Sequence, residues 1–73
     1  MLMLFILLVT NVRKEPLHGV KVELVGTDKV FYTNINGQVS VPFGFDLKLD
    51  YISYQTKIVK KDSIKQPIIL ISR

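Results

Sequence analysis

The sequence contains no cysteine, a single histidine and only four glycines among its 73 residues. Without cysteine the fold has neither a disulfide nor a thiolate metal site, so a hydrophobic core must stabilise it. His18 precedes Gly19 in a polar turn, and a transition-metal site there would need carboxylates that do not cluster nearby. The composition therefore predicts a protein with no metal and no cofactor.

Recognisable catalytic motifs are also missing. The glycines are isolated, so none forms a phosphate-binding loop, and no serine lies in a G-x-S-x-G sequence. Asp46 and Asp50 alternate with Lys48, which is typical of the solvent side of a strand and not of an acid/base pair. We expect no enzymatic activity.

The charge is positive, with a formal net value of +4. Most of the excess lies in residues 57–65, and it predicts solvated lysines on a sheet face and edge. Residues 43–45 read Phe-Gly-Phe, as in the aromatic strand of cold-shock nucleic-acid binders, but Asp46 would place an anion near the phosphates. We expect no nucleic-acid partner. The lysines of the basic stretch are Lys57, Lys60, Lys61 and Lys65, opposed only by Asp62.

Residues 1–9 are entirely apolar. The run is too short to cross a bilayer, which takes about 20 residues in a helix. It lacks the basic region of a signal peptide, and no small-residue cleavage site follows before residues 11–14. A buried strand is favoured, with a targeting segment as the alternative.

Period-two alternation predicts strands further along the chain. Residues 20–24 and 46–51 alternate apolar with charged side chains, and residues 30–33 are rich in β-branched and aromatic types. Asn36-Gly37 indicates a hairpin with positive φ at both residues. About seven short strands in a single domain over residues 1–73 predict an all-β sandwich. The expected core is Val20, Val22, Leu24, Val39, Val41, Leu47, Leu49, Tyr51 and Ile58.

The apolar first strand has no polar side, so both its faces need cover. The side chains on one face of the strand would point into the core, and those on the other face would form an exposed strip. We expect the strip to pair with a second copy of the chain in a two-fold dimer, the alternatives being a neighbouring domain or a targeting role. The predicted inward set is Leu2, Leu4, Ile6 and Leu8, and the predicted self-association strip is Met3, Phe5, Leu7 and Val9.

Three segments resemble the carboxypeptidase regulatory-like domain family. Residues 15–27 (EPLHGVKVELVGT) resemble its PL-x-G-V-x-V-x-x-x-GT element, and residues 33–41 (TNINGQVSV) resemble T-[DN]-x-[DN]-G-x-[FV]-x-[LIV]. Residues 50–56 (DYISYQT) are similar to SYIGY-x-T, and residues 8–11 stand where the first strand reads G-x-V-x-D. Ser53 replaces the usual glycine of the third element, which predicts a weaker need for positive φ at that position.

The resemblance implies a transthyretin-like (prealbumin-like) Greek-key β-sandwich. Such modules accompany peptidases and the N-termini of Bacteroidetes outer-membrane TonB-dependent transporters. It therefore implies a non-catalytic accessory or protein-interaction module in the periplasm or at the cell surface, although the missing cysteines fit the cytoplasm equally. The alternatives are a carbohydrate-binding module using Tyr32, Phe43 and Tyr54, and a basic nucleic-acid binder.

Overall fold

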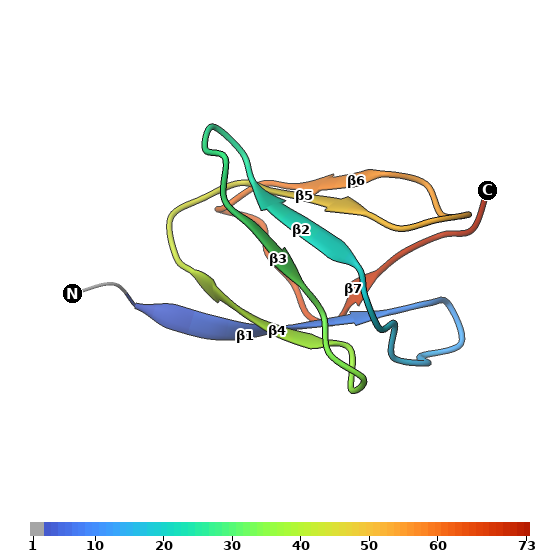
Figure 1. Cartoon of the computed structure of the whole chain (residues 1–73). Coiled ribbons are helices and arrows are strands. Elements are labelled where there is room, and N and C mark those ends of the chain that lie inside the picture. The colour runs from blue at the N-terminus through green and yellow to red at the C-terminus, as the bar shows by residue number, and fades with distance from the viewer. Residues whose placement is uncertain (1–2) are drawn as a thin grey trace.

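The computed structural model describes residues 3–73, which form seven strands and no helix (Figure 1). The all-β prediction and the expected number of strands are confirmed over this span. The strands are β1 (Leu4–Thr10), β2 (Lys21–Leu24), β3 (Val30–Tyr32), β4 (Gln38–Pro42), β5 (Leu47–Asp50), β6 (Lys57–Val59) and β7 (Ile68–Ile69).

The strands form two sheets that face each other (Figure 1). The first sheet has the order β4-β1-β7, with β1 antiparallel to β4 and parallel to β7. The second has the order β3-β2-β5-β6 and is antiparallel throughout. The inner faces of the two sheets pack against each other and form one shared apolar core.

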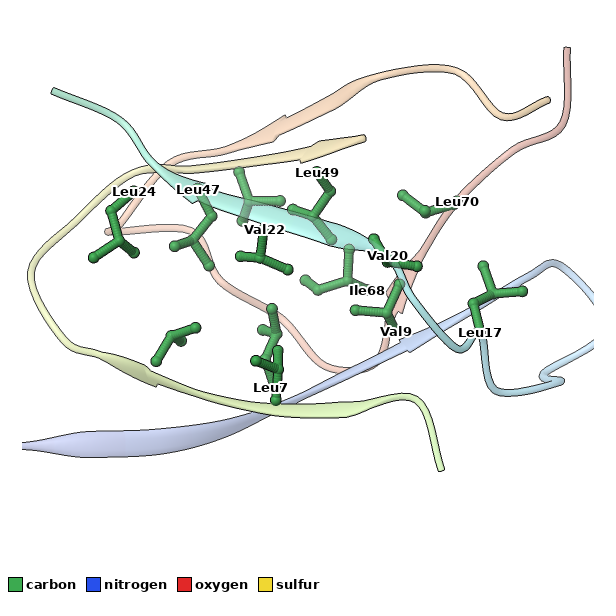
Figure 2. Packing of buried hydrophobic residues seen from close by; sticks show 13 residues of the cluster. Leu7, Val9, Leu17, Val20, Val22, Leu24, Leu47, Leu49, Ile68 and Leu70 are labelled. Atoms are coloured by element: carbon green, nitrogen blue, oxygen red, sulfur yellow. The ribbon is translucent and has the colours of Figure 1, made fainter. Parts of the chain in front are cut away.

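Thirteen buried hydrophobic residues from both sheets and their connections make up this core (Figure 2). The alternating strands supply it as expected, because every second residue of a strand points to the same face. The predicted residues that the structure buries are Val20, Val22, Leu24, Val39, Val41, Leu47 and Leu49.

The prediction for Ile58 is wrong. In the antiparallel ladder Ile58 lies opposite Lys48, and Val59 lies opposite the buried Leu47. Directly paired residues share a face of the sheet, so Ile58 points to solvent with Lys48, and Val59 enters the core. Tyr51 is half-buried at the margin of the core.

The predicted faces of the first strand are also reversed. Leu7 and Val9 are fully buried between the sheets, as Figure 2 shows, whereas Leu4 and Ile6 are 59% and 58% exposed. Of the predicted outward strip, Met3 is exposed and Phe5 is partly buried against the core. Leu2 lies outside the described residues, and Leu8, predicted to point inward, is half-buried.

The cause of this reversal is the pairing with β4. Leu7 lies opposite Val39 and Phe5 opposite Val41, and both valines face the core. A continuous apolar run has no alternation of its own, so its partner strand decides which side is buried.

Two expectations about turns need correction. Gly37 has φ of 73°, but Asn36 does not share a positive φ, and the turn leads from β3 in one sheet to β4 in the other. Asn36-Gly37 thus marks a tight turn between the sheets and not a hairpin. Ser53 has φ of 68°, so the left-handed conformation is retained there without glycine.

Candidate interaction surface on the first sheet

The outer faces of the two sheets differ in charge. On the second sheet, the ladder places Lys21 beside Asp50 and Glu23 beside Lys48. These charged side chains alternate with the buried residues of β2 and β5, so they lie on the solvent side. This face is the charged side of an ordinary half-buried sheet.

The outer face of the first sheet carries no charge along the β1–β4 ladder. Its rows join Leu4 to Pro42, which is itself buried, Ile6 to Ser40 and Leu8 to Gln38. Leu4 and Ile6 are well exposed at its centre, and the polar members are uncharged. An exposed apolar strip of this kind on a charged protein is typical of a surface that contacts another molecule.

One edge of β1 is only partly paired. Its odd-numbered residues direct their backbone groups toward β4, since Val9 N donates to Gly37 O at 2.8 Å and Phe43 N to Met3 O at 3.0 Å. The even-numbered residues therefore direct theirs toward the opposite edge. There β7 pairs only with Val9 and Thr10, at the far end of β1 (Figure 1).

The side chain of Gln66 covers the middle of that edge. Its Oε1 accepts from Leu8 N at 2.8 Å, and its Nε2 donates to Ile6 O at 2.8 Å. The amide thus makes the two contacts that the peptide groups of a neighbouring strand would make. Within residues 3–73, the N–H and C=O of Leu4 and the N–H of Ile6 have no hydrogen-bond partner.

A shallow hollow lies close to this open edge. It has a volume of about 380 Å³ and is lined by Phe5, Phe43 and Ile64 together with Gln66 and two charged residues at its rim. The rings of Phe5 and Phe43 are in contact, with centroids 4.6 Å apart. The open edge and an apolar hollow therefore occur together at one end of β1.

The aromatic residues considered for carbohydrate binding are not brought together. Tyr32 and Phe43 are exposed but line separate hollows, and Tyr54 packs on Tyr51 with ring centroids 5.5 Å apart. Tyr54 lines a third hollow, away from both. The described residues therefore do not gather these three rings into one stacking platform.

The acidic residues near the lysines have structural partners. Lys61 N donates to Asp46 Oδ1 at 2.8 Å, and Lys60 Nζ lies 3.6 Å from Oδ2. The hydrogen bond from Lys61, aided by both lysine charges and opposed by partial desolvation, lowers the pKa of Asp46. Thr56 Oγ1 donates to Asp50 Oδ1 at 2.6 Å. Both carboxylates thus fix loops to the ends of β5.

The remaining candidates are accounted for locally. His18 is exposed, and its carbonyl accepts a hydrogen bond from the Tyr51 hydroxyl at 2.7 Å. From residue 3 onward, no group of three His, Asp or Glu side chains is arranged to hold a metal ion. The same span contains no helix long and apolar enough to cross a membrane.

Sequence reasoning missed Leu4 and Ile6 as outward residues and missed Gln66 entirely. No pattern in the sequence marks Gln66, because its role depends on a contact 58 to 60 residues away along the chain. The chain matches no known protein-family model, no curated protein and no solved structure.

Proposed function

We propose that this protein is a non-catalytic protein-interaction module associated with the bacterial cell envelope, and that it binds through the outer face and open edge of β1. The observation that carries the proposal is the uncharged strip of Leu4 and Ile6 on a chain with a net charge of +4. An uncharged strip with two exposed aliphatic side chains side by side favours contact with another protein surface.

The resemblance to carboxypeptidase regulatory-like domains is the basis for the proposed transthyretin-like topology and for the proposed location in the cell envelope. Each of its three segments contains a residue with positive φ: Gly19 and Gly26 in the first, Gly37 in the second and Ser53 in the third. These tight turns agree with the places where the family pattern has glycine. They support a transthyretin-like Greek-key topology and an accessory role at the periplasm or cell surface.

The assignment as a non-catalytic module is supported by the roles of the polar side chains. Asp46 and Asp50 accept structural hydrogen bonds, and the carbonyl of His18 fixes a tyrosine. Since the three aromatic candidates lie apart, the carbohydrate-binding alternative has less support than the protein-interaction proposal.

Photo-crosslinking in cells tests the proposal. A photoreactive phenylalanine analogue is placed at Ile6, with the same substitution at Ile58 as the control, because the two side chains are equally exposed at 58% and 57%. We expect protein adducts from position 6 in the envelope fraction and few from position 58. Equal labelling at the two positions, or none at position 6, would contradict the proposed surface.

A further inference from the structure

We propose that two copies of this chain join by antiparallel pairing of β1 with β1, on a two-fold axis that passes through Phe5. The inference rests on the proposed function of β1 as an interaction surface, and it identifies the partner and the register. It replaces the strip of outward side chains expected from sequence with a strand edge. The evidence is the arrangement of the open backbone groups.

The hydrogen-bonding groups on the open edge are self-complementary. A two-fold axis at Phe5 places Leu4 opposite Ile6 of the second copy, and Ile6 opposite Leu4 of the second copy. In an antiparallel ladder, alternate residue pairs exchange both N–H···O bonds. Leu4 and Ile6 are the two residues on this edge with N–H groups that lack a partner within the described chain.

The pairing would form four backbone hydrogen bonds. Leu4 contributes its N–H and C=O, and Ile6 contributes its N–H and the second lone pair of its C=O, which already accepts from Gln66. The open groups of Leu4 and Ile6, which are those identified within residues 3–73, are then satisfied in both molecules. A strand of another protein would present the same alternating backbone groups, so the choice of a second copy rests on the neutral side chains beside the edge and not on the backbone alone.

Gln66 and β7 fix the length of the interface. The Gln66 amide occupies Leu8 N, and β7 occupies the edge at Val9 and Thr10. A second β1 can therefore extend only as far as the residues before Leu7. This limit excludes registers that slide toward the C-terminal half of β1.

Side-chain chemistry agrees with a neutral, self-associating partner. Leu4 and Ile6 of one copy would lie beside Ile6 and Leu4 of the other on the outer face, and their exposed area would be reduced. The β1–β4 rows of this face carry no charge, so the outer side chains that flank the paired strands do not oppose like charges. An acidic partner would find no basic side chain in these rows.

Sedimentation analysis of the purified protein is the first test. We expect a concentration-dependent dimer below about 100 µM, and a dissociation constant raised about tenfold or more by Ile6→Lys. Ile58→Lys is the matched control, because Ile58 is equally exposed but lies on the second sheet. Melting curves of both variants check that the fold is kept.

Hydrogen exchange and a proline substitution test the edge itself. The amides of Leu4 and Ile6 should become protected as concentration rises. Ile6→Pro removes an N–H that has no partner within residues 3–73, so it should weaken the dimer without removing a hydrogen bond of the monomer. A dimer with unprotected amides at these two residues would overturn strand pairing.

The outcomes separate this inference from the proposed function. A monomer at all concentrations, with adducts to other proteins at position 6, overturns the dimer and leaves the interaction surface intact. A dimer weakened equally by Ile6→Lys and Ile58→Lys, or by neither, overturns the assigned interface. An absence of adducts at position 6 in cells contradicts the proposed function itself.

Discussion

Two turns of the molecule share one pattern of hydrogen bonds but differ at the position with positive φ. The first turn follows β1 and begins at Asn11. Asn11 N donates to Glu15 O at 3.0 Å, and Lys14 N donates to Asn11 O at 3.0 Å. The Asn11 Oδ1 atom accepts from Arg13 N and Glu15 N, and Lys14 has φ of 66°.

The second turn connects β3 to β4 and repeats this arrangement from Asn34. Asn34 N donates to Gln38 O at 2.9 Å, and Gly37 N donates to Asn34 O at 2.9 Å. The Asn34 Oδ1 atom accepts from Asn36 N and Gln38 N. Gly37, with φ of 73°, stands where the first turn has a lysine.

The two turns differ in the space available beside the residue with positive φ. A Cβ atom on Gly37 would lie 2.7 Å from Val9 O and 2.9 Å from Pro16 Cβ, closer than real Cβ atoms come. Lys14 is exposed, so its side chain extends into solvent. Left-handed φ alone permits a lysine at a modest cost, whereas close backbone approach permits only glycine.

The largest expected effect comes from Gly37→Ala. The added methyl group combines a left-handed penalty of about 1–2 kcal/mol with overpacking of about 1–3 kcal/mol. Denaturant unfolding should therefore show a loss of about 2–5 kcal/mol. Lys14→Ala is the control. Its free energy of unfolding should change by about 0.5 kcal/mol or less, because lysine and alanine both have a Cβ atom and carry the same left-handed penalty. Similar losses in both variants would contradict the steric explanation.

Thr33→Val should have the next largest effect. Thr33 precedes Asn34, is buried, and its Oγ1 donates to Leu17 O at 2.6 Å and accepts from Val20 N at 2.9 Å. Valine would leave both backbone groups without this partner, at a cost of about 1–3 kcal/mol.

Thr10 provides the matched control for that substitution. It precedes Asn11 and is equally buried. Within residues 3–73 its hydroxyl makes a single hydrogen bond, which it donates to the neighbouring Asn11 O at 3.1 Å. Thermal melting should therefore show a smaller loss for Thr10→Val than for Thr33→Val. The reverse order would mean that the long-range hydrogen bonds of Thr33 contribute little.

The two asparagines should make similar contributions to stability. Asn11→Ala and Asn34→Ala each remove an acceptor for two backbone N–H groups, and each should cost about 1 kcal/mol. Asn11→Ala also removes an exposed hydrogen bond from Asn11 Nδ2 to Glu15 Oε1 at 2.7 Å, which should add little because the pair is in solvent. Agreement between the two free energies of unfolding would show that the shared pattern has the same strength in both turns. A clearly larger loss at Asn34 would indicate that the contact at Gly37 depends on its turn geometry.

The smallest expected effect is a gain in stability. Lys14→Gly relieves left-handed strain of about 1–2 kcal/mol and adds about 0.5–1 kcal/mol of backbone entropy to the unfolded chain. The net gain should be between about 0 and 1.5 kcal/mol, seen as a small rise in the melting temperature. A loss of stability would mean that the Lys14 side chain makes a favourable contact with its surroundings.

Much of the second sheet could be predicted from sequence, because Val22, Leu24, Leu47 and Leu49 alternate with charged residues. The orientation of β1 could not, since both its faces are apolar and its partner strand decides between them. Alternation also cannot predict the buried face of a three-residue strand such as β6. A shift of one residue in its pairing would bury Ile58 in place of Val59.

The candidate surface was harder to predict than the core. The sequence indicated that one side of β1 would be exposed, but the open groups at Leu4 and Ile6 depend on where β7 and Gln66 end their contacts. Asn36-Gly37 indicated a turn, yet nothing local shows that the strands it joins belong to different sheets. Long-range pairing decides both features.

The parallel pairing of β1 with β7 has a consequence for the order of events during synthesis. Val9 and Thr10 pair with Ile68 and Ile69, so β1 is made long before its second neighbour exists. At about 5–20 residues per second, roughly 3–12 s separate the two strands on the ribosome. Contacts of such long sequence separation also slow folding, to about milliseconds to seconds for all-β domains. Until Ile68 and Ile69 are made, the edge of β1 at Val9 and Thr10 lacks its partner strand, and an unpaired edge of an apolar strand favours aggregation.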